Sequence, residues 1–174
     1  MYNMQLIKFL KKCINLLLFI YLTWYLCNKL YYKFNLGGVT VASIKAVEGI
    51  GQAYEAKLSE IGIKSTDDLL EKGASKKGRK TIAEESGISE KLILKWVNHV
   101  DLFRIKGIGP QYAELLEASG VDTVPELATR KPDNLLAKMI SINEEKKLVK
   151  GLPALKQVEK WVLQAKELPK VVKY

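Results

Sequence analysis

Residues 107–112 read GIGPQY, and residues 49–54 read GIGQAY. Each stretch places glycine, isoleucine and glycine before two further residues and a tyrosine. Glycine adopts backbone conformations that other residues avoid, so this pattern predicts a sharp turn. Because the whole stretch recurs 58 positions later, we expect one structural unit to be present twice.

The similarity continues downstream of both turns. The identical pairs are Gly49/Gly107, Ile50/Ile108, Gly51/Gly109, Tyr54/Tyr112, Leu58/Leu116, Gly62/Gly120 and Leu69/Leu127, and KWV at 95–97 matches KWV at 160–162. We therefore divide the body into a first unit, 42–102, and a second unit, 103–168, followed by a tail, 169–174. The later match has the wider spacing, which places inserted residues within 139–153.

The periodicity of both units predicts helices. Tyr54, Leu58 and Ile61 recur at helical spacing, and no stretch of the body alternates convincingly with period two. Gly62 and Gly120 are expected to end these helices, because glycine adopts the left-handed conformation at low cost. The sequence predicts an all-α fold in which the two units pack into one helical body.

Further helix starts follow both glycines. Thr123 with Glu126 predicts a capping box, and Ser65 with Asp68 predicts a weaker version of it. Residues 81–102 predict two helices separated at Gly87. Trp96 and Trp161 lie in apolar helical stripes, so we expect them to be core residues.

A hydrophobic segment precedes the body. Residues 13–27, CINLLLFIYLTWYLC, are flanked by lysines and are short for a membrane span. Two interpretations of residues 1–40 stay open: a signal anchor that tethers the protein to a membrane, or translated sequence upstream of a true start at Val41. The protein is expected in the cytoplasm, and at a membrane if 13–27 is a genuine span.

Charge and composition limit the function. The net charge is +9, but residues 1–40 hold five of the 28 basic residues and none of the 19 acidic ones. The body is therefore weakly basic, and nucleic-acid contact would depend on local patches. The cysteines, Cys13 and Cys27, lie outside the body, and the single histidine, His99, is expected on a helix surface or half-buried. We expect no metal site, cofactor or catalytic activity.

A turn of this kind exposes backbone N–H groups at the start of the following helix. The helix dipole places partial positive charge at the same point, so a phosphate fits without any base being read. The predicted binding is independent of nucleic-acid sequence and weakened by salt.

The segments 43–58, SIKAVEGIGQAYEAKL, and 102–116, LFRIKGIGPQYAELL, resemble helix-hairpin-helix motifs. The continuations GIKSTDDLL (62–70) and GVDTVPELA (120–128) strengthen the resemblance. The run from 42 to 168 is similar to a prokaryotic domain-of-unknown-function family built from tandem helix-hairpin-helix units with a SAM-like fold. This resemblance implies binding of DNA, or of RNA, through backbone phosphates.

The two turns are not equally suited to an anion. Lys106 precedes the second turn, whereas Glu48 and Glu55 flank the first, so we expect the second to be functional and the first to be chiefly structural. The run KKGRK, 76–80, is either a phosphate-steering patch or a solvated loop and first helical turn. The candidate nucleic-acid-binding residues are Arg104, Lys106, Gly107, Ile108, Gly109, Gln111, Gly49, Ile50, Gly51, Lys76, Lys77, Arg79 and Lys80.

Two other functions remain open. The units could keep the fold without the phosphate and act as a protein-interaction or scaffolding domain, including a membrane-tethered one. Alternatively, Ala83, Gly87 and Ile93 have the spacing of a helix-turn-helix regulator, although an ordinary helical corner has the same spacing.

Overall fold

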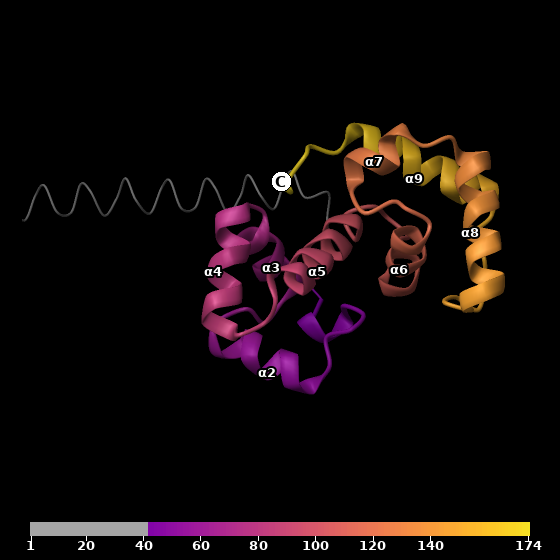
Figure 1. The fold of residues 1–174 in the computed structure, drawn as a ribbon. Coiled ribbons are helices and arrows are strands. Elements are labelled where there is room, and N and C mark those ends of the chain that lie inside the picture. Colours follow the sequence, from indigo (N-terminus) through magenta and orange to yellow (C-terminus); the bar gives the residue numbers. More distant parts are fainter. Residues whose placement is uncertain (1–41) are drawn as a thin grey trace, which may run out of the picture. The chain divides into compact units, whose positions relative to one another are not determined.

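The structure, a computed structural model, describes residues 42–174 and builds them from helices (Figure 1). The elements are η1 (Ile44–Ala46), α2 (Gln52–Glu60), α3 (Thr66–Gly73), α4 (Lys76–Ser86), α5 (Glu90–Leu102), α6 (Pro110–Ala118), α7 (Val124–Thr129), α8 (Pro132–Lys146) and α9 (Leu155–Glu167). Within this range there are no strands, only an isolated bridge between Ser43 and Ser65. The all-α prediction is confirmed.

The two Gly-Ile-Gly sequences form equivalent turns. The first glycine of each has a positive φ, +86° at Gly49 and +95° at Gly107, which a residue with a side chain adopts only with strain. The isoleucine between the glycines is buried in both turns, and the second glycine is the N-cap of α2 or α6. Each turn is thus anchored from inside by its isoleucine.

The helices that follow end as the sequence predicts. At the end of α2, the Gly62 N–H donates to the Ser59 carbonyl and the Ile63 N–H donates to the Leu58 carbonyl. This pair of bonds is a Schellman motif, and it satisfies carbonyls that would otherwise lack a partner. The same two bonds recur around Gly120 at the end of α6.

The sequence predicts the stronger capping box at α7 and the weaker one at α3, but the structure shows the full box at α3. Ser65 and Asp68 form a full capping box, in which each side chain bonds to the backbone of the other residue. Thr123 accepts from the Glu126 N–H, but the Glu126 carboxylate accepts from the Asp122 N–H at 2.8 Å. The Asp68 carboxylate accepts from the equivalent Lys64 N–H as well, at 3.1 Å, so the two caps differ only in the bond to the N-cap N–H.

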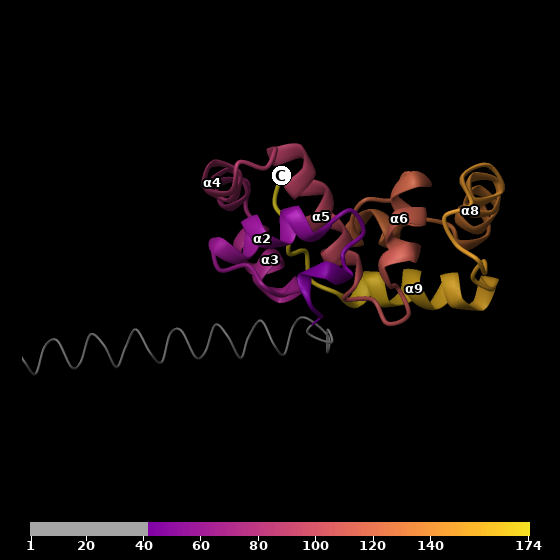
Figure 2. The ribbon, with the colours of Figure 1, turned by 90° about the horizontal axis from the view of Figure 1, so that it is seen from below.

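Each half of the body has its own core. In Figures 1 and 2, α2 to α5 gather together and α6 to α9 gather beside them. Trp96 and Trp161 are fully buried, as predicted, and pack against Tyr54 and Tyr112 with ring centroids 5.1 and 5.2 Å apart. Helix α5 joins the halves, because it packs against α3 and α4 and also contacts α6.

The extra residues of the second half lie where the sequence places them. Helix α8 is 15 residues long and α4 is 11, and the connection 147–154 is longer than its counterpart 87–89. Both additions fall at or near the predicted range 139–153.

The corner between α4 and α5 is followed by a helix whose second half is buried. Gly87 ends α4 in the left-handed conformation, and Ser89 caps α5. Every residue from Trp96 to Leu102 is buried. The second half of α5 therefore has a packing role, while Lys91 near its start is exposed.

The tail 169–174 returns to the first half. The Lys173 N–H donates to the Ala74 carbonyl at 2.8 Å, and the Tyr174 hydroxyl donates to Asn98 Oδ1 at 2.9 Å. Val172, the residue before Lys173, is buried. The tail therefore fastens the end of the second half to α3, α4 and α5.

The hydrophobic segment 13–27, with the remainder of residues 1–41, lies outside the described part of the chain. Within residues 42–174, no helix combines the length and apolar composition needed to cross a bilayer.

Candidate nucleic-acid interface

The second turn presents unoccupied backbone donors. No acceptor within residues 42–174 bonds to the N–H groups of Gly109, Gln111 or Tyr112. A Cβ placed on Gly109 would meet no atom within 4 Å, so the space beside this residue is open. Pro110 occupies the first helical position, where its missing N–H has no cost. These donors lie at the positive end of the α6 dipole, which favours an anion.

Side chains around the second turn are neutral or basic. Lys106 is exposed, and its backbone N–H donates to Gln164 Oε1 at 3.0 Å, which ties the turn to α9. The Nε2 of Gln157 lies 3.6 Å from the position of a Cβ at Gly107. An anion at this turn would therefore meet a lysine and amide groups.

The first turn has the same backbone but different surroundings. The N–H groups of Gly51, Gln52 and Ala53 also lack an acceptor within the described range, and the space beside Gly51 is open. However, the Glu55 carboxylate in the first turn of α2 pairs with Lys45 at 3.1 Å. A carboxylate at this position disfavours an approaching phosphate.

Four of the candidate nucleic-acid-binding residues are buried, which corrects the prediction that they contact nucleic acid. Ile50 and Ile108 are 6% and 5% exposed, so they hold the turns and cannot line a binding surface. Arg79 and Arg104, expected at the surface, are 2% and 3% exposed. Neither guanidinium is available to a ligand in this structure.

Both arginines have structural partners. Arg104 pairs with the buried Asp101 at 2.7 Å and donates to the Pro169 carbonyl. Arg79 donates to the Gly73 carbonyl and to the Lys173 carbonyl, and so fixes the tail. Burial of a charge is costly unless it is paired and hydrogen-bonded. Arg104 has both kinds of contact, whereas Arg79 is held by carbonyl oxygens and makes no ion pair within the described residues.

The remaining basic residues of the run 76–80 are exposed. Lys76, Lys77 and Lys80 lie in the first turns of α4, which begins at Lys76 after its cap, Ser75. Lys80 makes a 3.7 Å ion pair with Glu84, a solvent-exposed contact of small energetic value. The run is thus the start of a helix and offers three surface cations.

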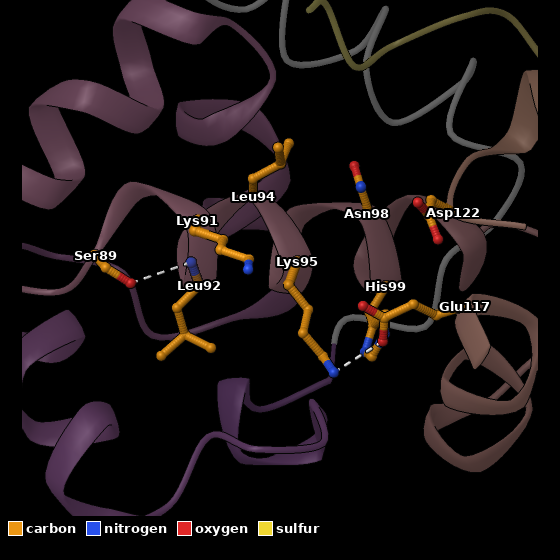
Figure 3. A pocket seen from close by; sticks show the side chains of 9 residues that line it. All are labelled: Ser89, Lys91, Leu92, Leu94, Lys95, Asn98, His99, Glu117 and Asp122. Carbon is orange, nitrogen blue, oxygen red and sulfur yellow. Dashed lines mark hydrogen bonds and ion pairs between the residues drawn. The ribbon is translucent and has the colours of Figure 1, made fainter. Parts of the chain in front are cut away.

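A charged cluster that no sequence pattern predicts lies between α5 and α6. His99, expected at or near the surface, is 1% exposed. Its Nε2 lies 2.9 Å from Glu117 Oε2, which also accepts from Lys95 Nζ at 2.8 Å. Figure 3 shows both side chains directed at Glu117 along the wall of a pocket of about 410 Å³. No motif marked these residues, because they meet only after α5 and α6 pack.

The surroundings of Glu117 determine its ionisation. Burial alone would raise the pKa of this carboxyl, but the hydrogen bonds and positive charges of Lys95 and His99 outweigh burial and lower its pKa. Ionised Glu117 therefore bridges the two halves of the body.

A comparison with known families matches residues 48–168 to one described as "Domain of unknown function (DUF4332)". No curated protein and no solved structure matches the chain. The matched region contains both glycine turns and all eight α-helices of the described range. The tail, 169–174, follows the matched region. The chain belongs to the DUF4332 family.

Proposed function

We propose that the two glycine turns are helix-hairpin-helix motifs and that the protein binds DNA, or RNA, through backbone phosphates without catalysing a reaction. The observation that carries this proposal is the set of unoccupied N–H groups at Gly109, Gln111 and Tyr112 beside open space. A buried or self-bonded turn could not offer these donors to a ligand.

The second turn is the main contact in this proposal. Lys106, which precedes the turn, adds an exposed positive charge, and Gln111 is exposed on the first turn of α6. Gly107 supplies the bend, and Gly109 leaves room for the phosphate oxygen. The contacts involve only the sugar-phosphate backbone, so no base preference is expected.

The first turn and the start of α4 have lesser roles. Gly49, Ile50 and Gly51 form the turn but share their surface with the Lys45–Glu55 ion pair. Lys76, Lys77 and Lys80 are exposed and add long-range attraction. Each phosphate contact made by such a lysine steepens the salt dependence of binding.

Fluorescence anisotropy with a short labelled duplex tests the proposal. Lys106→Glu should weaken binding about tenfold or more, since it replaces a charge-assisted contact with repulsion. Lys91→Glu, the same charge change at an exposed site near the start of α5, is the matched control and should have a smaller effect. Binding at the second turn would be refuted if the duplex affinity did not change with salt concentration, or if it fell equally in both variants.

Gly109→Ala separates binding from folding. The φ of Gly109 is −109°, which alanine adopts freely, and no atom lies within 4 Å of the added methyl group. The methyl group would occupy the space proposed for the phosphate. We expect a folded protein with reduced duplex affinity; unchanged affinity would place the contact elsewhere.

A protein-interaction function is the second candidate, and exposed apolar side chains favour it. Leu163 on α9 is 59% exposed and Leu152 before α9 is 42% exposed. In this case Leu163→Glu should abolish co-purification of a partner that survives nuclease treatment, while Lys106→Glu should not. A partner lost on nuclease treatment would favour nucleic acid.

The nucleic-acid proposal also requires the described part of the chain to lie in the cytoplasm, whether or not residues 13–27 form an anchor.

A further inference from the structure

A second, polar pocket lies between the end of α6 and the start of α8, and its lining carries three cationic side chains. Its volume is about 330 Å³. The lining residues are Ser119, Thr129, Arg130, Lys131, Asn134, Leu135 and Lys138. No carboxylate contributes to the lining. The pocket is therefore a concentrated positive site on a body that is only weakly basic.

The cationic groups of this pocket have no acidic partner. Within residues 42–174, Arg130, Lys131 and Lys138 make no ion pair within 4 Å. Arg130 donates to the Gly120 carbonyl at 2.7 Å, and Lys138 Nζ lies 3.2 Å from the position of a Cβ at Gly120. Two positive charges thus converge on one residue. The carbonyl groups at the C-terminal end of α6 attract both charges, and an anion in the pocket would offset the remaining repulsion between them.

A buried hydroxyl provides an independent observation. Ser119 is 3% exposed and lines the pocket, and its Oγ has no hydrogen-bond partner within the described residues. An unsatisfied buried hydroxyl costs free energy, and an acceptor that entered from the pocket would relieve this cost. The oxygen of an anion would be that acceptor.

The start of α8 adds backbone donors. The N-cap, Lys131, makes no side-chain capping bond, and no acceptor within residues 42–174 bonds to the N–H groups of Asp133 or Asn134. The helix has 15 residues, so a full dipole supports its N-terminus. The exposed carboxylate of Asp133 opposes an anion but does not line the pocket.

The first half of the body lacks the hydroxyl of this cluster. Lys72, the counterpart of Arg130, donates to the carbonyls of Ile61 and Gly62. At the positions equivalent to Ser119 and Thr129, the first half has Ile61 and the acidic Glu71. The hydroxyl thus belongs to the second half alone, whereas a cation at the helix end, Lys72 or Arg130, is present in both halves.

We propose that this pocket binds a phosphate group. A phosphate has four oxygens in a tetrahedron and accepts from several directions at once, which suits a guanidinium, two ammonium groups and a hydroxyl. The group belongs to a free phosphate, to a small phosphorylated compound or to a nucleic-acid backbone. The site is independent of the glycine turns and stands whether or not they bind DNA.

NMR titration of ¹⁵N-labelled protein with inorganic phosphate at constant ionic strength tests the pocket. We expect saturable shifts of the Ser119, Gly120 and Asn134 amides with a Kd of about 1 mM or tighter. Lys138→Gln should weaken binding about tenfold. Lys146→Gln, the same change two turns further along α8, is the matched control and should leave binding unchanged.

Ser119→Ala provides a second variant with an independent signature. It removes a buried hydroxyl that lacks a partner, so the thermal stability without phosphate should stay the same or rise. Phosphate affinity should fall. Shifts that do not saturate, or that respond equally to Lys138→Gln and Lys146→Gln, would overturn the proposal.

A short DNA duplex forms the second arm and identifies the source of the phosphate. If Lys138→Gln weakens both phosphate and duplex binding, the pocket receives a backbone phosphate. If it weakens phosphate binding alone, the ligand is a free phosphate or a small phosphorylated compound. Gly109→Ala should leave phosphate binding at the pocket intact, which keeps the outcome separate from that of the turns.

Discussion

The indole Nε1 of Trp161 lies 3.2 Å from the position that a Cβ would take on Gly107. Trp96 and Gly49 repeat this relationship at 3.3 Å in the first half. Both tryptophans are fully buried, and neither Nε1 has a hydrogen-bond partner within the described residues. Two constraints therefore favour glycine at the first position of each turn. The backbone has a positive φ, and the tryptophan ring leaves little room for a side chain.

Gly107→Ala should destabilise the protein by about 1–3 kcal/mol, because alanine is strained at a positive φ and its methyl group would press on Trp161. Urea unfolding would measure the loss. Gly109→Ala is the matched control: it has an ordinary φ and an open neighbourhood, so its cost should stay below about 1 kcal/mol. Equal losses in the two variants would contradict the described geometry.

Gly78→Ala should be more damaging. A Cβ at Gly78 would lie 1.9 Å from the Lys72 carbonyl oxygen, so α3 and α4 would have to separate. We expect a loss of about 3 kcal/mol or more, or failure to fold. The neighbouring exposed Lys77→Ala should change the unfolding free energy by no more than about 0.5 kcal/mol, and a similar loss there would show that the effect is not steric.

Asp101→Asn should cost about 3–5 kcal/mol, because it leaves the buried Arg104 guanidinium without its compensating charge. Glu55→Gln, which breaks the more exposed pair with Lys45, should cost no more than about 1 kcal/mol. Chemical denaturation of both variants would compare the pairs. In a double-mutant cycle, Asp101→Asn with Arg104→Met should cost less than the sum of the single changes, and additive costs would argue against direct coupling.

The stabilising effect of Glu117 should depend on pH. The pKa of its carboxyl is lowered in the folded protein, so its contribution to stability is fully present above the unfolded value of 4.5 and is lost as the pH falls through the folded pKa. The difference in Tm between the wild type and Glu117→Gln should therefore be largest at neutral pH and shrink below about pH 4.5. A difference that stays constant down to pH 3 would show that ionisation of Glu117 is not the cause.

Features that depend on neighbouring residues in sequence were predictable. The ends of α2 and α6 at Gly62 and Gly120 follow from local backbone preference, and the caps at Ser65 and Thr123 follow from the reach of short polar side chains. The duplication supports each of these predictions, because the same pattern occurs in both units. The buried tryptophans were predictable for the same reason, because each lies in an apolar stripe at the same place in its unit.

Features that depend on packing were not predictable. A lysine and an arginine look alike in a basic run, yet Lys77 is exposed and Arg79 is buried beneath the tail. Arg104 lies two positions from Lys106, but its side chain is buried and pairs with Asp101, which lies one helical turn earlier. The contact of His99 with Glu117 joins residues 18 positions apart on different helices, and no local pattern specifies it.

The return of the tail to the first half has a consequence for biosynthesis. Arg79 and Asn98 receive their partners from Lys173 and Tyr174, which are translated more than 70 residues later. Until those residues leave the ribosome, the guanidinium of Arg79 lacks one of its acceptors. The earlier half can therefore collapse during synthesis but reaches its final bonding only once Lys173 and Tyr174 have emerged.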